Sequence, residues 1–500
     1  MLRELRIVGN HALQEVWEDD LALKLHVLLD SMEVKWTSTD VVRIRDVEES
    51  FAPVILWIGV IPTSLSGDDG VIVASKCREL LVECNIADVN VEIRESAVIH
   101  SVGPKLLTPA ETSNPTVDAR EPLTTTLGLP ICAESTPWAE GTGGFFITEG
   151  GNTERLLLVT ARHVVFNPGK NENKHFEHKN GSQRYKVTLF GDAAFNKYLK
   201  SIKAKIEGKE STVEYRSRCI EAIERKGGRA ANKDPRKVRE ELYKARVAIE
   251  ELDIFYRDIL THWTTPESHI LGHIILSPPI SVGVGSSGSY TEDWAVIEID
   301  PSKVDTSNFG GNAIDLGTRI PFVKFIRMVC PNHQDTYSYK HPHDRLLRVK
   351  DTIPDEEMRH LTALDENDDP CLMVIKRGNT TGLTVGRANN IFSYARNYYN
   401  DNKTETSKEW AILPFDSKSG PFSAKGDSGS VIVDRLGRIG GLLTGGAGAT
   451  SSLDITYATP IGFLLKRMQE NGLHEPNISP ALATDSQNPY AENYFPNWTL

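Results

Sequence analysis

Three short strings determine the fold: LLLVTARHVVF (156–166), EDWAVIEID (292–300) and AKGDSGSVIV (424–433). Each places one reactive side chain beside an apolar run typical of a strand. His163 follows such a run, Asp293 precedes one, and Ser428 stands between glycines just before the third. One such string alone is weak evidence, because histidines and glycine-rich turns are common structural features. All three strings in the order histidine, aspartate, serine indicate a nucleophilic serine site.

These three residue types have complementary chemical roles. A serine hydroxyl is a weak nucleophile unless a neighbouring base accepts its proton, so His163 is the expected base for Ser428. The second ring nitrogen of the histidine must be held by an acceptor, and Asp293 suits that role. Glu292 and Asp300 lie in the same string and compete with Asp293 for it. We therefore expect a catalytic triad of His163, Asp293 and Ser428.

The sequence around the three strings is typical of a mainly β protein. From residue 128 the chain has short strand-like runs separated by glycine, such as GGFFITEG (143–150), and the pattern resumes after residue 370. Many short strands with glycine-rich turns predict barrels or sandwiches and not alternating βαβ units. Because this strand pattern surrounds the three strings, the segment of about residues 128–470 resembles the trypsin/chymotrypsin-like serine peptidase superfamily. Subtilisin-like enzymes and α/β-hydrolases place the same three residue types in other orders.

The resemblance implies further properties of the chain. The fold would be a trypsin-like double β-barrel with the active site between the barrels. The activity would be peptide-bond hydrolysis through an acyl-enzyme, without a cofactor or metal. The backbone N–H groups of Gly426 and Ser428 would form the oxyanion hole. An aromatic residue at the base of the specificity pocket, with no carboxylate there, favours small or apolar substrate side chains. The implied substrate-binding residues are Phe422, Thr444, Gly445 and Gly446.

The chain also departs from the secreted members of that superfamily. No paired cysteines flank His163, and no Ile-Val-Gly-Gly-like segment precedes the expected barrels. Asp427 therefore lacks the terminal-amine partner that it has in those enzymes, and the sequence does not indicate a replacement. In these respects the chain is more similar to intracellular proteins of the HtrA type, or to fungal trypsin-like proteins, than to the secreted enzymes.

The sequence divides into several segments. The first has alternating helix-like and strand-like patterns and predicts a small α/β domain, in which Ser66 and Asp69 mark a helix start. A Pro/Thr/Ser-rich stretch then predicts a linker. The expected segments are the α/β domain (1–101), the linker (102–127), the first barrel (128–329), an inter-barrel connection (330–369), the second barrel with a C-terminal helix (370–472) and a tail (473–500).

Residues 192–263 interrupt the first barrel with helical patterns. Apolar residues recur at spacings of three and four in 236–263, which predicts a coiled-coil seam, and an earlier segment carries a matching seven-residue repeat. KGGRAANKD (226–234) between them indicates a turn, so we expect an inserted helical hairpin. Residues 196–246 carry 16 Lys and Arg against 8 Asp and Glu. This basic excess makes the hairpin a candidate arm for a protein partner; the alternative is a solvated insertion without a function of its own.

Composition and motif spacing limit the possible partners, cellular location and metal sites of the protein. The formal net charge of -12 argues against a nucleic-acid partner, and no apolar run is long enough for a membrane span. Six scattered cysteines and the lack of a signal-peptide pattern favour an intracellular, cytoplasmic location. Cys330, His333, His341 and His343 do not match a standard zinc spacing and are interpreted as loop residues. The oligomeric state is not indicated.

Two other functions remain open from the sequence. A catalytically silent trypsin-like module could keep the barrels and bind partners without turnover. An acyl (ester) hydrolase could use the same triad, because the fold does not decide the substrate.

Overall fold

A computed structural model of the chain describes residues 3–46, 51–61, 64–96, 103–150, 155–179, 181–225, 234–285, 290–305, 309–332, 339–365, 369–398, 404–448 and 454–480. The chain divides into two compact units, Met1–Val102 and Gly103–Leu500. None of the described helices is long and apolar enough to cross a membrane. His333, one of the loop histidines, lies outside the described residues.

The first unit is a four-stranded sheet with helices packed on it. The sheet has the order β1-β2-β3-β4, and only β3 and β4 are parallel. Ser66 caps the helix that joins these two strands by accepting the N–H of Asp69, as the sequence predicts. The elements are β1 (Arg3–Arg6), α1 (Leu13–Val16), η1 (Trp17–Leu21), α2 (Ala22–Ser31), β2 (Trp36–Asp46), β3 (Val54–Val60), α3 (Gly67–Glu83) and β4 (Asn90–Glu95).

The second unit is mainly β, and its first sheet closes into a barrel. The sheet runs in the order β6-β5-β10-β11-β14-β8-β7, with β9 paired to β11. Its two edge strands are separated in sequence by Gly144 alone, so the chain bends there and the edges meet. The strands are β5 (Leu129–Ala133), β6 (Gly141–Gly143), β7 (Phe145–Thr148), β8 (Leu156–Thr160), β9 (Phe176–Glu177), β10 (Lys186–Leu189), β11 (Ile270–Ser277) and β14 (Ala295–Ile299).

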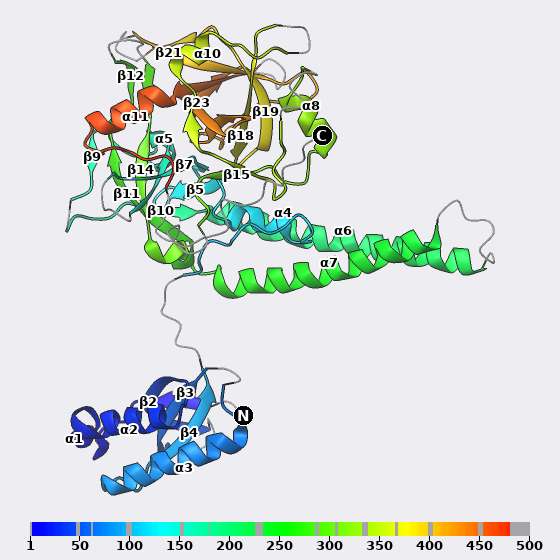
Figure 1. The fold of residues 1–500 in the computed structure, drawn as a ribbon. Helices are drawn as coiled ribbons and strands as arrows, with labels where there is room; N and C mark the ends of the chain where they lie inside the picture. The colour runs from blue at the N-terminus through cyan, green and yellow to red at the C-terminus, as the bar shows by residue number, and fades with distance from the viewer. Residues whose placement is uncertain are drawn as a thin grey trace, which may run out of the picture. The chain divides into compact units, whose positions relative to one another are not determined.

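The second sheet of this unit forms another ring. Its described strands pair in the order β21-β19-β18-β22-β23, and β24 pairs with both β23 and β21 and so closes the ring. This closure, with that of the first sheet, gives two barrels (Figure 1). The strands are β18 (Leu372–Gly378), β19 (Gly382–Ala388), β21 (Thr404–Pro414), β22 (Val431–Asp434), β23 (Arg438–Ala447) and β24 (Ile455–Pro460), and α11 (Ile461–Glu470) follows them.

Shorter elements connect and extend the barrels. β15 and β16 pair with each other, β17 adds to β23, and β20 adds to β21. They are α4 (Val117–Arg120), η2 (Glu121–Leu123), α5 (Arg162–Val165), η3 (Pro266–His269), β12 (Ser281–Val284), β13 (Tyr290–Glu292), η4 (Pro301–Lys303), β15 (Ala313–Asp315), α8 (Phe322–Val329), β16 (Leu346–Arg348), β17 (Asp351–Thr352), α10 (Asp355–Arg359) and β20 (Ser393–Tyr398).

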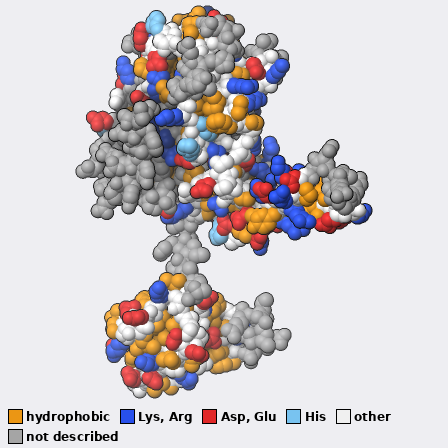
Figure 2. Space-filling model, turned by 45° about the vertical axis from the view of Figure 1, so that its right-hand side comes forward, with side chains coloured by type: hydrophobic (Ala, Val, Ile, Leu, Met, Phe, Trp, Pro, Cys, Tyr) orange, Lys and Arg blue, Asp and Glu red, His pale blue; other side chains and the backbone are white. Residues whose placement is uncertain are grey.

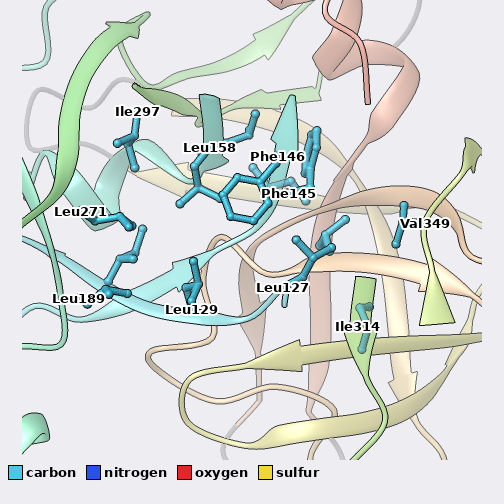
Figure 3. Packing of buried hydrophobic residues seen from close by; sticks show 14 of the residues in the cluster. Leu127, Leu129, Phe145, Phe146, Leu158, Leu189, Leu271, Ile297, Ile314 and Val349 are labelled. Atoms are coloured by element: carbon cyan, nitrogen blue, oxygen red, sulfur yellow. The ribbon is translucent and has the colours of Figure 1, made fainter. Parts of the chain in front are cut away.

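One apolar core runs through the first barrel and continues towards the second. Alternate residues of the strands point inward, as the period of two in a β-strand requires. Figure 3 shows Leu158, Leu189, Leu271 and Ile297 meeting inside the first barrel, and each is fully buried. The same cluster includes Val433 and other residues of the second barrel, so the barrels share a packed boundary.

The segment expected to be a linker is packed in part. Leu106, Leu123 and Leu127 are buried and belong to the same core cluster. The buried Arg345 side chain donates to Thr112 Oγ1 at 2.9 Å and pairs with Asp315 at 3.0 Å. Residues 103–127 therefore form a strap across the barrel unit. Its Pro, Thr and Ser content reflects irregular backbone, and its few leucines supply the packing.

The inserted segment contains two long helices, α6 (Asp192–Arg225) and α7 (Pro235–His262), between β10 and β11 (Figure 1). The ion pairs Arg216–Glu241 and Glu224–Arg239 join the helices to each other. Near the barrel, however, residues of both helices belong to the barrel core. These are Phe195, Tyr198, Ile202, Ile206, Leu252, Phe255 and Ile259. The base of the hairpin is therefore core, whereas its outer half contacts mainly itself.

This division predicts different effects of changes at the two ends. Leu252 is 1% exposed, so Leu252→Ala should lower the free energy of unfolding by about 2–5 kcal/mol. Replacing residues 210–246 with a short Gly/Ser linker should leave thermal unfolding close to wild type, because the described residues of that range lie outside the barrel core cluster. Tyr243→Ala, at a residue 69% exposed, is the control for the point variant. A deletion variant that fails to fold would contradict this division.

Candidate active site

The pairing of β8 with β14 brings the histidine and aspartate strings together. The strands are antiparallel with Thr160 opposite Ala295, so residues after Thr160 lie beside residues before Ala295. His163 Nδ1 lies 2.6 Å from Asp293 Oδ2, and the His163 backbone N–H donates to Asp293 Oδ1 at 3.1 Å. One carboxylate therefore orients the imidazole and also fixes the helical turn that carries it.

Asp293 and burial have opposite effects on the pKa of His163. Asp293 is 5% exposed, whereas the His163 side chain keeps 29% exposure and is reachable from solvent. Burial lowers the pKa of His163, but the charge of Asp293 and its hydrogen bond outweigh this effect. The net pKa is raised above the ordinary value of 6.5. The carboxylate thus favours the protonated ring that general-base catalysis would produce.

The structure gives both competing carboxylates other partners. Glu292 is 3% exposed and pairs with Arg467, whose Nε and Nη2 lie 2.7 and 2.9 Å from its two oxygens. Asp300 accepts the N–H and hydroxyl of Ser302 and caps the short helix η4. Of the three carboxylates, Asp293 is therefore the one hydrogen-bonded to His163.

The turn that carries Ser428 packs directly against the first barrel. Gly429 has a φ of +88°, which disfavours other residues. A Cβ there would lie 2.3 Å from Thr160 Oγ1 and 3.1 Å from the nitrogen of Ala161, so the position also has no room for a side chain. The Ser428 carbonyl accepts the Thr142 N–H at 2.9 Å. Ser428 is thus held beside the end of β8, and this strand ends three residues before His163.

The Ser428 hydroxyl and the His163 ring are not hydrogen-bonded to each other among the described residues. Nucleophile–base hydrogen bonds are often long in unliganded enzymes and tighten when substrate binds. The structure therefore brings His163 and Asp293 into contact and positions Ser428 on the adjoining turn.

Backbone amides around Ser428 fall into two groups. The N–H groups of Asp427 and Gly429 donate to the carbonyls of Ala424 and Leu443. Within the described part of the chain, the N–H groups of Gly426 and Ser428 have no protein acceptor. Two unpaired donors flanking the same residue are the arrangement that an oxyanion hole requires.

Sequence reasoning missed the residue that supports this turn, Lys376 on β18. Its Nζ lies 3.1 Å from Asp427 Oδ2, and neither side chain is exposed. Burial lowers the pKa of Lys376 to about 8, although Asp427 opposes that shift. Burial raises the pKa of Asp427, but Lys376 and hydrogen bonds lower it by more. The pair is charged at neutral pH. The one signal in the sequence was a lysine inside the apolar run LMVIKRG (372–378).

A pocket of about 280 Å³ opens beside Ser428 and partly matches the expected substrate site. Gly445 and Gly446 line it, whereas Thr444 does not. Phe422, expected at its base, is instead 1% exposed in the core of the second barrel and does not line the pocket. Its ring fills the space beside Gly386, where a Cβ would lie 2.6 Å from it.

Two charged residues that the sequence did not indicate also line this pocket, Asp454 and Lys425. The expectation of small or apolar substrate side chains assumed a pocket without a carboxylate. The presence of Asp454 removes that premise. Among the described residues, no group of three or more His, Cys, Asp or Glu side chains could hold a metal ion.

Comparisons with known proteins give only weak likenesses. The chain matches no protein-family model and no curated protein. Among solved structures, it is similar to a glutamic-acid-specific serine protease (11% identity, 69% of this chain and 97% of that chain, TM-score 0.30). It is also similar to a Nocardiopsis protease (12%, 69% and 96%, TM-score 0.28) and to the active form of the Rv3671c protease from M. tuberculosis (13%, 78% and 100%, TM-score 0.26). Because these TM-scores are below 0.5, the proposals below rest on the geometry of the site.

The buried ion pair predicts a large effect of Lys376. Lys376→Met should lower the free energy of unfolding by about 3–5 kcal/mol, because it leaves the Asp427 carboxylate buried without a counter-charge. Adding Asp427→Asn to that variant should restore part of the loss. Lys418→Met, at an exposed lysine, should change stability by less than about 0.5 kcal/mol. Denaturant unfolding measures all three variants, and a wild-type midpoint for Lys376→Met would exclude this role.

Proposed function

We propose that this chain is a serine endopeptidase of the trypsin-like kind, with His163, Asp293 and Ser428 as its triad. The observation that carries the proposal is the double hydrogen bond from His163 to Asp293, beside a turn that holds Ser428 against the same strand end. These are the nucleophile, base and orienting group that acyl transfer needs.

The proposed mechanism follows from these positions. Ser428 Oγ attacks the substrate carbonyl while His163 Nε2 accepts the hydroxyl proton, because Nδ1 is committed to Asp293. The oxygen of the substrate carbonyl gains negative charge and is bound by the N–H groups of Gly426 and Ser428. The imidazolium then gives its proton to the leaving amine. Water attacks the acyl-enzyme in the same way and restores Ser428.

The surroundings of Ser428 favour an extended peptide as substrate. The pocket beside it is bordered by the end of β23, where Gly445 and Gly446 have no side chains to obstruct a neighbouring chain. Main-chain pairing along such a strand is a common way to bind peptides. An acyl (ester) hydrolase with the same triad, or a catalytically silent module that binds partners, are the alternatives. Fluorophosphonate labelling separates the silent module from both enzymes, and peptide digestion separates peptidase from esterase.

We further propose an intracellular protein of HtrA or fungal trypsin-like character, without a cofactor, in which the outer hairpin binds a protein partner. The described cysteines form no disulfide, which fits a reducing compartment. Figure 2 shows Lys and Arg side chains along the hairpin, mixed with Asp and Glu. Several of these charges pair within the hairpin, such as Arg239 with Glu224 and Lys244 with Glu240. The partner surface would therefore use the exposed lysines outside these pairs, such as Lys209.

The triad proposal predicts the loss of both labelling and hydrolysis in Ser428→Ala. Turnover should fall by about three to six orders of magnitude, because no other described group replaces the nucleophile. Ser417→Ala, at an exposed serine on a neighbouring loop, should behave as wild type. Mass spectrometry of fluorophosphonate adducts and of products from a peptide mixture measures both effects. Unchanged hydrolysis by purified Ser428→Ala would exclude a serine mechanism.

The pKa of His163 predicts an acid limb in the activity profile. The neutral ring is the base, so the rate should fall as pH drops through a pKa that Asp293 holds above 6.5. Asp293→Asn should move this limb to lower pH and reduce turnover about 10⁴-fold. Asp300→Asn is the matched control and should keep the wild-type profile. If Asp300→Asn lost activity and Asp293→Asn kept the wild-type profile, Asp300 and not Asp293 would be the residue that orients His163.

A further inference from the structure

The residue before His163 is a buried arginine that the proposed mechanism does not use. Arg162 is 2% exposed, although it lies on α5, the short helix that carries the proposed base. Its guanidinium packs against Phe166, 4.6 Å from the centroid of the ring. Arginine is seldom fully buried unless it is paired, and it keeps its charge in proteins. The partners of Arg162 therefore bear directly on the position and charge of His163.

The hydrogen bonds of Arg162 connect the two sides of the His163–Asp293 pair. Its Nη1 donates to the Ser277 hydroxyl at 2.8 Å, and this hydroxyl donates to the Trp294 carbonyl, also at 2.8 Å. Trp294 follows Asp293 in the chain, and both Ser277 and Trp294 are fully buried. The residue before the base is thus tied, through one hydroxyl, to the residue after the carboxylate that orients it.

The same guanidinium also holds the segment that follows α5. Its Nη2 donates to the Lys174 carbonyl at 2.7 Å and to the Glu172 carbonyl at 3.5 Å. The side chains of Glu172 and Lys174 are exposed and pair with each other. Nη1 donates in addition to the Ser277 carbonyl at 3.1 Å. One planar fork thus binds two separate segments, a geometry that the single ammonium of a lysine does not reproduce.

The charge of Arg162 is not cancelled by these contacts. Its hydrogen-bond acceptors, within the described residues, are carbonyls and a hydroxyl, all of them neutral. Burial lowers the pKa of Arg162, and the charge of Asp293 opposes this shift. Charges interact more strongly in a buried environment than in water. The cation therefore offsets part of the negative charge with which Asp293 raises the pKa of His163.

Other charged groups around the pair do not supply this positive charge. Glu292 is paired with Arg467, so their charges compensate each other. Glu409 on β21 is buried, and its pKa is raised by burial and by the charge of Asp293. Among these described groups, Arg162 is the cation without a carboxylate partner.

We propose that Arg162 is a positioning residue of the triad. Its fork fixes His163 relative to Asp293, and its charge limits how strongly that carboxylate favours the protonated ring. The first effect keeps Nε2 directed towards Ser428, and the second keeps the base neutral at lower pH. The effect on the reaction of Ser428 rests on the proposed function, whereas the effect on the protonation of His163 does not.

Protonation of His163 is tested first, because it needs no turnover. Diethyl pyrocarbonate reacts with neutral imidazoles, so mass spectrometry of the full chain modified across a pH series gives the midpoint of each histidine. Arg162→Met should raise the His163 midpoint by about half a pH unit or more, because the loss of a nearby cation favours the protonated ring. Arg162→Lys keeps the charge and should stay near wild type. The exposed His360 is the internal reference and should not move.

Positioning is tested by the rate at which a fluorophosphonate labels Ser428 above the His163 midpoint, where the ring is neutral. Arg162→Lys loses the fork, and Ser277→Ala loses the hydroxyl that links Arg162 to Trp294. Both variants should be labelled about tenfold more slowly, since a small misplacement of a reacting group is costly. Arg184→Met, at an exposed arginine of the same barrel, should match wild type in both experiments.

The outcomes separate this proposal from a purely structural role and from the proposed function. If Arg162→Met is less stable but keeps the wild-type midpoint and labelling rate, the proposal is overturned. An unchanged midpoint with slower labelling overturns the role of the charge. If Arg162→Met does not fold, wild-type labelling of Arg162→Lys and Ser277→Ala overturns the proposal. If wild-type Ser428 is not labelled, the proposed function fails, and the midpoint of Arg162→Met still decides the effect on His163.

Discussion

The candidate site depends on how closely the two barrels approach each other at two glycines. A Cβ on Gly144 would lie 2.4 Å from the carbonyl oxygen of Gly429, so the contact leaves no room for side chains. Thr142 fixes the approach by two bonds at 2.9 Å, from its N–H to the Ser428 carbonyl and from its hydroxyl to the Gly426 carbonyl. Because His163 follows the strand next to Thr142, this contact sets the distance between the proposed base and nucleophile.

The sequence predicted those parts of the site that depend on short segments. Each reactive residue lies beside an apolar strand, and strand pairing alone brings His163 to Asp293. Long-range partners were not predictable. Glu292 pairs with Arg467, which lies 175 positions further along the chain, and this pairing distinguishes it from Asp293. Asp427 pairs with Lys376, which lies 51 positions earlier. No local pattern connects such residues, because their contact exists only after both barrels have closed.

Composition was also a poor guide to packing in irregular segments. The strap reads as a linker because few of its residues are apolar, yet Leu106 and Leu123 are buried. The family resemblance implied that Phe422 binds substrate, but its ring is buried in the core of the second barrel. The count of basic residues on the hairpin likewise gives only its total charge. Ion pairs within the hairpin, such as Arg216 with Glu241, decide how many of these residues are free to contact a partner.

The hairpin has a consequence for how the first barrel forms. β10 and β11 are adjacent strands, although residues 190–269 separate them in sequence. Two helices that pack against each other form through local contacts and bring the ends of this segment together. Closing a flexible loop of that length would cost about 2–3 kcal/mol more in chain entropy than closing a tight turn. The packing of α6 against α7 therefore brings two strands that are distant in sequence nearly as close together as a short turn would, and contacts that are closer along the chain favour faster folding.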